Sequence, residues 1–365
     1  MFKCILLSYI KYYRLYNYNM SFENYKNKGL SGLANLGNTC FINSCIQILS
    51  HTYELNEFLN GGNYKRKLKN IHDSVLLIEW DNLRTMMWND NCVISPGKFI
   101  KTIQKIAHIK QAELFTGYAQ NDLPEFLLFI IDCFHNSLSR EVNMTINGTA
   151  MNDTDIMATK CFEMIKQMYT KEYSEIWNLF YGIHVSQINS LETGETLSTT
   201  PEPYFMINLS IPPNNKEPSL EDCFELYVNG ETLEGENAWY NETTKIKQNV
   251  QKKISYWSFP NILAIDIKRF NHKNQKNQML IKFPLDNFNL SKYVIGYKKE
   301  SYVYDLYGIC NHSGNVHGGH YTAFIKNAND EWYHFNDTLV KKVNDTNELI
   351  TPKAYCLFYR KKTIQ

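Results

Sequence analysis

The order of hydrophobic patterns along the chain is the feature that most constrains its fold. Before about residue 180, apolar residues recur at helical spacing, as they do in the segment 40–50. After that point they alternate with polar residues, so that Leu263, Ile265 and Ile267 share one face of a predicted strand. A helical first part followed by a β-rich second part predicts an α+β fold.

A second helix is predicted to begin after Asp122. Asp122 suits the N-cap, Glu125 completes a capping-box pattern three residues later, and Pro124 is tolerated in the first turn. The polar segment 140–158 is predicted to be a loop or an insertion. Further strands are predicted at Tyr321–Ile325, Trp332–Phe335 and Ala354–Tyr359.

The composition argues against two classes of partner. The 365 residues have a formal net charge of +1, whereas a nucleic-acid-binding protein usually has a basic excess. No apolar run approaches the roughly 18–20 residues that cross a bilayer. We therefore expect no nucleic-acid partner and no membrane partner. We also expect the protein to be a monomer. Residues 1–29 are predicted to be a poorly ordered N-terminal extension.

Nine cysteines are scattered through the chain, and none of them forms a Cys-x-x-Cys pair. An odd number at such spacings argues against a disulfide framework and against a zinc ribbon. The pattern predicts a reduced intracellular protein, in the cytoplasm or the nucleus, whose cysteines are mostly small core residues. We expect Cys40 to be the exception.

Cys40 has the local setting of a nucleophile. The turn Gly37–Cys40 leads directly into the first predicted helix. A thiol at a helix N-terminus lies near unpaired N–H groups and the positive end of the helix dipole, which favours the thiolate. Taken alone, the same pattern also fits a buried structural cysteine.

A base for this thiol is predicted at His320. In an antiparallel hairpin with its turn at Asn327–Asp330, facing residues have numbers that sum to about 656, which places His320 beside Asn336. The amide oxygen of Asn336 would then accept the Nδ1–H of His320 and fix its tautomer. Gly318 and Gly319 would let a substrate backbone approach closely.

The chain order cysteine, histidine, asparagine is the order found in papain-like proteases. His317 is a rival base, but it lies in the glycine-rich loop with no orienting residue predicted opposite it. His312 is predicted to pack in a loop, and Lys268 with Arg269 to form a solvated charge pair on a strand.

The sequence resembles the ubiquitin-specific protease family in blocks that follow the family's order. Gly32–Gln47 resembles its cysteine box, and His312–Ala323 with Trp332–Asp337 resembles its histidine box. The other matching blocks are Gly117–Phe126, Leu263–Phe270 and Ala354–Tyr359. Together these blocks span about residues 30–360.

This resemblance implies a papain-like fold in one catalytic domain, residues 30–361. A helical thumb would occupy about residues 30–178, β fingers about residues 179–255, and a β-rich palm about residues 256–361. The implied activity is that of a deubiquitinating cysteine protease, and the implied partners are ubiquitin and ubiquitinated proteins.

The resemblance also implies a role for each matched residue. Cys40 would attack the carbonyl of the C-terminal glycine of ubiquitin, and His320 would accept the thiol proton and later protonate the leaving amine. Asn336 would orient His320, with Asp337 assisting. Asn35 would donate an amide N–H to the oxyanion of the tetrahedral intermediate.

Substrate contacts are implied for five positions in the matched blocks. Asp122 matches a family position that contacts the basic ubiquitin tail, although a helix-capping role fits it equally well. The substrate-binding residues implied are Gln120, Asp122, Gly318, Gly319 and Tyr321.

The chain departs from the family where many members hold a structural zinc with two Cys-x-x-Cys pairs. The first pair is replaced by Ser190-Leu-Glu-Thr193 and the second by Ala238-Trp-Tyr-Asn241. These side chains cannot form a thiolate zinc site. We therefore expect no cofactor and no zinc, with the fingers held by strand pairing and packing.

Two alternatives to an active deubiquitinase stay open. The first is a catalytically inactive ubiquitin-binding module, which usually lacks the cysteine or the histidine, whereas here both positions are filled. The second is a protease for another ubiquitin-like modifier, because the surfaces that would bind the body of the modifier are not recognisable in the sequence.

Overall fold

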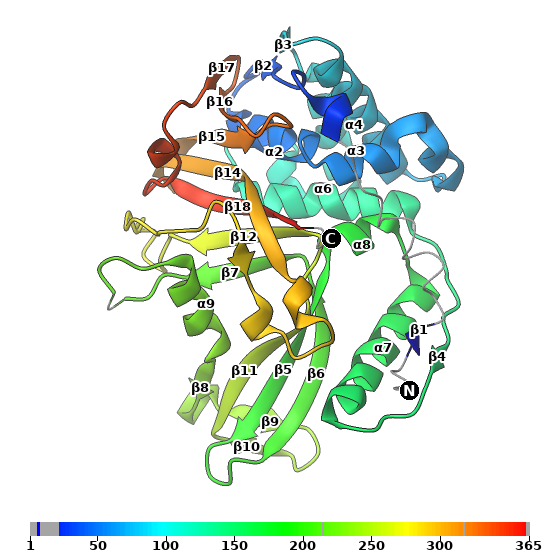
Figure 1. Ribbon diagram of the computed structural model, residues 1–365, viewed down its shortest axis with the longest axis vertical. Coiled ribbons are helices and arrows are strands. Elements are labelled where there is room, and N and C mark those ends of the chain that lie inside the picture. Colours follow the sequence, from blue (N-terminus) through cyan, green and yellow to red (C-terminus); the bar gives the residue numbers. More distant parts are fainter. Residues whose placement is uncertain (1–5, 8–21, 214, 317, 363–365) are drawn as a thin grey trace.

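A computed structural model describes residues 6–7, 22–213, 215–316 and 318–362. The thumb-like helical part gathers at one end of the molecule, and long strands extend to the other end (Figure 1). The helices are α2 (Cys40–Ser50), α3 (Tyr53–Leu59), α4 (His72–Asn89), α5 (Gly97–Lys110), α6 (Leu123–Leu138), α7 (Asp153–Lys171), α8 (Glu175–Phe180) and α9 (Leu220–Val228). Short 3-10 turns are η1 (Phe22–Tyr25), η2 (Asn60–Lys67), η3 (Glu113–Phe115), η4 (Gly235–Asn237), η5 (Ser291–Tyr293), η6 (Lys299–Ser301) and η7 (Thr346–Leu349).

The largest sheet has eight strands, in the order β17-β16-β15-β14-β18-β12-β7, with β13 paired to β14. All its pairs are antiparallel except that of β12 with β7, which is parallel. The strands are β7 (Met206–Ser210), β12 (Ile262–Lys268), β13 (Phe288–Asn289), β14 (Val303–Asn315), β15 (Gly318–Lys326), β16 (Trp332–Asn336), β17 (Leu339–Lys342) and β18 (Ala354–Lys361).

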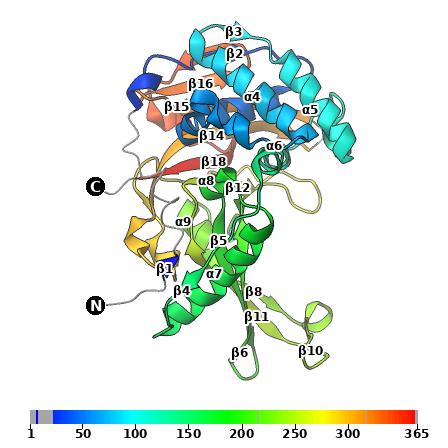
Figure 2. The same ribbon diagram turned by 90° about the vertical axis from the view of Figure 1, so that its right-hand side faces the viewer.

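A second sheet, in the order β6-β5-β11-β8, extends away from the first. In the side view of Figure 2, α7 runs along this sheet, and the hairpin of β9 and β10 lies at its far end. The remaining strands are β5 (Gly182–Ser190), β6 (Thr196–Tyr204), β8 (Glu231–Leu233), β9 (Trp239–Asn241), β10 (Ile246–Gln248) and β11 (Val250–Ser258), with the small pairs β1 (Leu6–Leu7) with β4 (Ile146–Asn147) and β2 (Gly32–Leu33) with β3 (Val93–Ile94).

The α+β prediction is confirmed. The helix expected at 40–50 is α2, the one expected after Asp122 is α6, and the strands expected near the C-terminus lie within β15, β16 and β18. The loop predicted over 140–158 is wrong in its second half, since α7 begins at Asp153. The Asn152 side chain caps this helix by accepting the Asp155 N–H at 2.9 Å.

Two further expectations need correction. The strand β7 falls in the range expected for the fingers, yet it is hydrogen-bonded into the larger sheet beside β12. The extension predicted over 1–29 is well packed in its last part, because Tyr25 stacks on Tyr53 at 4.6 Å and is 5% exposed. Residues 1–5 and 8–21 lie outside the described residues. The exact boundaries of thumb, fingers and palm stay a prediction.

The large sheet is buried on both faces. One face packs under the helices α2 and α6, where Tyr307, Cys310 and Phe358 join their core. The opposite face contributes Leu306 and Ile309 to a second core together with α9. This double burial explains why its central strands are rich in apolar residues at both odd and even positions.

Within the described residues, no helix is both long enough and apolar enough to cross a bilayer.

Arg360 joins the two halves of the molecule. It lies on β18 and donates its Nε–H to Glu54 of α3 at 2.7 Å and an Nη2–H to the carbonyl of His51 at 2.8 Å. Its guanidinium also lies over the rings of Tyr53 and Tyr307, 4.7 and 4.5 Å from their centroids. A guanidinium desolvated in this way is held by charge and by the aromatic faces together.

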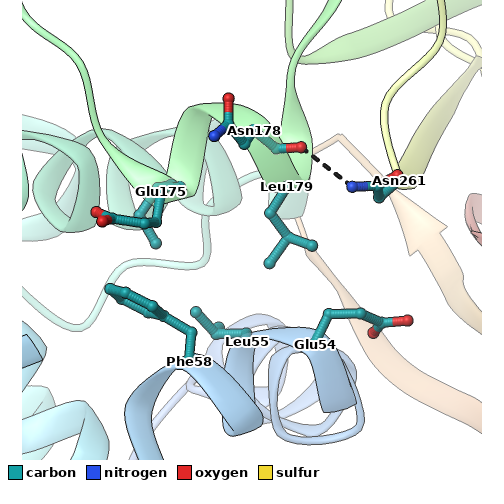
Figure 3. Close-up of a pocket in the computed structure, with 8 residues that line it drawn as sticks. Glu54, Leu55, Phe58, Glu175, Asn178, Leu179 and Asn261 are labelled. Atoms are coloured by element: carbon teal, nitrogen blue, oxygen red, sulfur yellow. Dashed lines mark hydrogen bonds between the residues drawn. The ribbon is translucent and has the colours of Figure 1, made fainter. Parts of the chain in front are cut away.

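A pocket lies beside this contact, between α3 and α8 (Figure 3). Leu55, Phe58 and Leu179 point into it from the two helices. The carboxylate of Glu175 at its rim is already paired with Lys67 and Arg140, each at 2.7 Å. The pocket is therefore an apolar seam between helices rather than a polar reaction site.

Replacing Arg360 by methionine should destabilise the protein, because the Glu54 carboxylate would stay in a mostly buried position without its partner. We expect a loss of about 3 kcal/mol in the free energy of unfolding, measured by urea denaturation. The double variant Arg360→Met with Glu54→Gln removes both charges and should recover part of that loss. A double variant no more stable than the single one would contradict this account.

Candidate active site

The first turn of α2 is built around Asn35. Asn35 Oδ1 accepts the backbone N–H of Gly37 and of Thr39, each at 3.1 Å. The intervening residue Asn38 has a φ of 52°, in the left-handed region where asparagine is tolerated. This closed turn delivers Cys40 as the first residue of the helix, where its side chain is 3% exposed.

The Cys40 thiol faces β15. Burial raises the pKa of this thiol above its ordinary value, a hydrogen bond with the backbone of Tyr321 lowers it, and the negative charge of Asp337 raises it again. The net shift is upward, whereas the position at the helix N-terminus was expected to favour the thiolate. Desolvation has the largest effect on the pKa of this thiol, ahead of the backbone hydrogen bonds that lower it. The thiol therefore needs a base.

His320 is held by Asn336, as predicted, but through the other ring nitrogen. The His320 Nε2 lies 2.7 Å from Asn336 Oδ1, whereas we expected Nδ1 there. Because Nε2 is engaged, Nδ1 is the nitrogen left for the thiol. An amide oxygen as partner requires that Nε2 carry the proton, which is the tautomer with an unprotonated Nδ1.

The hairpin register also differs from the prediction. Ala323 pairs with Phe335, so facing residues sum to 658 rather than to about 656. By extension of this register Asn336 falls opposite Thr322, which makes His320 its diagonal neighbour on the same face. Diagonal neighbours are roughly 7–8 Å apart at the backbone, a gap that two polar side chains span.

Asp337 connects the two loops around the thiol. Its φ is 49°, and its backbone carbonyl accepts the Leu33 N–H at 2.8 Å. Its carboxylate accepts an amide N–H from Asn35 at 3.0 Å and another from Asn43 at 2.7 Å. Asp337, which directly follows Asn336, thus ties the end of β16 to the segment that precedes Cys40 and to the first turn of α2.

Gln120 makes two hydrogen bonds to the backbone of Gly319, the residue before His320. Its Oε1 accepts the Gly319 N–H at 2.8 Å, and its Nε2 donates to the Gly319 carbonyl. A Cβ on Gly319 would lie 2.3 Å from His312 Nε2, so packing within the chain requires glycine at this position, and its contact with substrate stays a prediction. A Cβ on Gly318 would meet only Gln120 Oε1, at 3.8 Å, which leaves its surroundings open.

Asp122 contacts β15 instead of capping its helix. Its Oδ1 accepts the hydroxyl of Tyr321 at 3.0 Å, and its side chain makes no cap hydrogen bond, so the predicted capping box is wrong. Burial raises the pKa of Asp122, and hydrogen bonds from Tyr355 and Tyr321 lower it, with a net upward shift. Burial and the nearby charge of Asp122 raise the pKa of Asp266 to about 7.

Sequence reasoning missed three polar residues near the site. Asn43 contacts Asp337, and Tyr355 and Asp266 lie near Asp122. Asn43 lies one turn after Cys40 in the predicted helix, but Ser44, Gln47 and Ser50 are also polar residues of that helix, so polarity alone did not single it out. For Asp266 the alternating strand pattern suggested an exposed position, but the position is mostly buried. Tyr355 lies in an apolar strand sequence that does not indicate a polar contact. The fold brings its hydroxyl to Asp122.

The secondary candidates have mixed outcomes. His312 packs against the rings of Phe270 and Tyr321, as predicted, but it lies in β14 and not in a loop. Burial together with the charge of Lys276 lowers its pKa to about 4. Arg269 is not solvated but 1% exposed, and it donates to the carbonyls of residues 354, 277 and 279. His317 lies outside the described residues.

The cysteines in the described part of the chain are all free thiols. The prediction that they are core residues is confirmed for most of them and wrong for Cys92, which is exposed. Cys4 lies outside the described residues.

A thiol at a helix N-terminus, an imidazole on a facing strand and an amide that orients it are arranged as in papain-like cysteine proteases. Comparison with known sequences specifies the family. The family model described as "Ubiquitin carboxyl-terminal hydrolase" matches residues 31–359, and the chain belongs to this family.

Curated relatives support the same assignment. The chain is 34% identical over 343 residues to ubiquitin carboxyl-terminal hydrolase Usp2 of Drosophila melanogaster, covering 92% of this chain and 35% of that protein. It is 34% identical to human ubiquitin carboxyl-terminal hydrolase 2, covering 91% and 55%, and 31% identical to human ubiquitin carboxyl-terminal hydrolase 21, covering 91% and 61%. The chain thus spans between about a third and three fifths of the length of these relatives.

The fold is shared with solved structures. A chain of the SAGA Ubp8/Sgf11/Sus1/Sgf73 DUB module bound to ubiquitin aldehyde superposes with a TM-score of 0.70 at 23% identity, covering 98% of this chain and 75% of that one. The same module bound to monoubiquitin also gives 0.70 at 23% identity, with the same coverage. The expected papain-like fold of the family is confirmed.

The raised pKa of Cys40 makes its alkylation by iodoacetamide depend on pH. At neutral pH the thiolate fraction should be small, and the rate should keep rising as the pH passes the ordinary thiol range near about 8.5. The rate is measured by mass spectrometry on the Cys40 peptide, with exposed Cys92 as internal reference. Alkylation of Cys40 that is faster than that of Cys92 and constant below neutral pH would contradict the shift.

Proposed function

We propose that this chain is a deubiquitinating cysteine protease that hydrolyses the peptide or isopeptide bond after the C-terminal glycine of ubiquitin. The observation that carries the proposal is the pairing of His320 with Asn336 on strands that pack beside the start of α2, where Cys40 lies. Family membership supplies the substrate class.

The reaction begins with proton transfer. His320 accepts the Cys40 proton on Nδ1 as the sulfur attacks the glycine carbonyl, and Asn336 stabilises the imidazolium that forms. His320 then protonates the leaving amine. Water, deprotonated by the same imidazole, attacks the thioester and releases the ubiquitin carboxylate while the Cys40 thiol is restored.

The oxyanion of each tetrahedral intermediate is assigned to Asn35. Its Nδ2 has two protons, and Asp337 binds one of them. The second proton remains available for the substrate oxygen. The bond to Asp337 fixes the orientation of this amide, so its second N–H keeps a defined direction toward the substrate oxygen.

The tail of ubiquitin is assigned to the space over Gly318, between the thumb residue Gln120 and β15. Asp122 is the carboxylate that we assign to a basic residue of the tail, and its bond with Tyr321 fixes its direction. We propose ubiquitin and ubiquitinated proteins as partners of an intracellular monomer with no nucleic-acid partner. The low net charge supports the last point.

The direct test is hydrolysis of a ubiquitin C-terminal fluorogenic amide. Cys40→Ala should lower the rate by roughly 10³-fold or more, because the nucleophile is removed. Cys92→Ala is the matched control, since it removes an exposed thiol that takes no part in the proposed reaction and should keep the wild-type rate.

The other outcomes identify the alternatives. A folded wild type that binds ubiquitin without hydrolysing the amide would indicate the inactive binding module. A wild type that ignores ubiquitin but reacts with an active-site probe built on another modifier would indicate a protease for that modifier.

We also propose that the fingers hold no zinc. At the positions of the family's metal ligands, Ser190 Oγ accepts the N–H of Thr193 at 3.1 Å, and Asn241 Oδ1 accepts the N–H of Thr243 at 2.9 Å. Asn241 Nδ2 also donates to Gln248 at 2.8 Å. Hydroxyl and amide groups are poor zinc ligands, and here they close the turns that a metal would otherwise hold.

Metal analysis of the purified protein should therefore find less than one zinc per chain, and a chelator such as EDTA should leave Tm unchanged. The physical reason is that no binding free energy of a metal contributes to folding. Stoichiometric zinc together with a fall of Tm in EDTA would contradict the proposal.

A further inference from the structure

We propose that Asn43 is a positioning residue for this reaction, because it orients the Asp337 carboxylate that in turn holds the oxyanion donor Asn35. The inference rests on the proposed function. Asn43 Nδ2 donates to Asp337 Oδ1 at 2.7 Å, the shortest of its contacts, and also lies 3.4 Å from the carbonyls of Leu33 and Ala34. The residue is 2% exposed.

The two oxygens of Asp337 are shared between two amides. Oδ1 accepts from Asn43, and Oδ2 accepts from Asn35 at 3.0 Å. Rotation of the carboxylate would break both bonds, so each amide restricts the other through Asp337. With Asn43 in place, one proton of Asn35 Nδ2 is bound to Oδ2 and the other keeps a defined direction.

Asn43 lies on the same helix as Cys40, so its contact with Asp337 relates the oxyanion donor to the sulfur. Asn43 lies one turn after Cys40 in α2, which is buried along its whole length. The chain of contacts from Asn43 through Asp337 to Asn35 therefore ties the oxyanion donor to the same rigid element that carries the sulfur. A misplacement of about 1 Å between a reacting atom and its partner costs roughly 100-fold in rate, so such a tie has kinetic value.

The chemistry of Asn43 favours this role over simple packing. Within the described residues its Oδ1 is buried and has no hydrogen-bond partner. An amide buried with an unsatisfied oxygen is unfavourable, and an apolar residue of similar size would avoid that cost. What the amide contributes is its N–H group, and the nearest acceptor of that group is Asp337.

An exchange of the two side chains tests the inference. Asn43→Asp places a carboxylate against Asp337, and Asp337→Asn places an amide N–H₂ against either Asn43 or Asn35. Each single variant should lose about 10- to 100-fold in kcat on the fluorogenic ubiquitin amide with KM unchanged, since the donor acts on the transition state. In the double variant, the amide introduced at position 337 would donate to the carboxylate introduced at position 43 and still accept from Asn35, so kcat should recover most of the loss.

The variant Gln47→Glu is the matched control. Gln47 lies on the same face of α2 one turn further on, is 2% exposed, and donates to the Ser31 carbonyl at 2.7 Å, away from Asp337. It introduces the same charge change as Asn43→Asp, so Tm should fall while kcat is kept. This separates the cost of a buried carboxylate from the loss of positioning.

Two results would overturn the inference: wild-type kcat in Asn43→Asp, or a folded double variant no faster than the single ones. If Asn43→Asp does not fold, the double variant decides alone, since its activity supports the relay and its inactivity in a folded state refutes it. An inactive wild type would instead refute the proposed function.

Discussion

The whole arrangement depends on the complete burial of α2. Every residue of Cys40–Ser50 is buried, with helix α6 on one side and the strands β14 to β16 on the other. A helix enclosed in this way is located by packing on each side, because protein interiors are close-packed and resist displacement. The distance between the sulfur and β15 is therefore set by the core. The polar contacts of Asn35 and Asp337 add direction to groups whose positions the core already determines.

Burial also sets the charge state of the free site. It raises the pKa of Cys40 and of Asp122, raises that of Asp266 to about 7, and lowers that of His312 to about 4. In each case the low-dielectric surroundings favour the neutral form. In the proposed reaction, a basic residue of the substrate tail and the thiolate of Cys40 would meet these groups only after the substrate has excluded water.

Much of this could be predicted from the sequence, and the failures have physical causes. The position of Cys40 at a helix start and the pairing of His320 with Asn336 follow from local patterns of a few residues. The hairpin register was wrong by two because the structure pairs Ala323 with Phe335, and no residue type in the turn fixes that choice. Long-range contacts, such as Asp122 with Tyr321, need a fold to bring segments about 200 residues apart together. Arg269 was misjudged because carbonyls, not carboxylates, surround it, and these leave no mark in the sequence.

The position of β18 has a consequence for biosynthesis. Ala354–Lys361 lies in the middle of the large sheet, between β14 and β12, although it follows both of them along the chain. Until these residues leave the ribosome, the sheet has two unpaired inner edges, and exposed strand edges invite aggregation or capture by chaperones. Cys40 and His320 are synthesised before the strand that completes the sheet beneath them. A nascent chain therefore carries Cys40 and His320 for a time without the core that holds them in place, and their relative position is fixed only after β18 has been inserted.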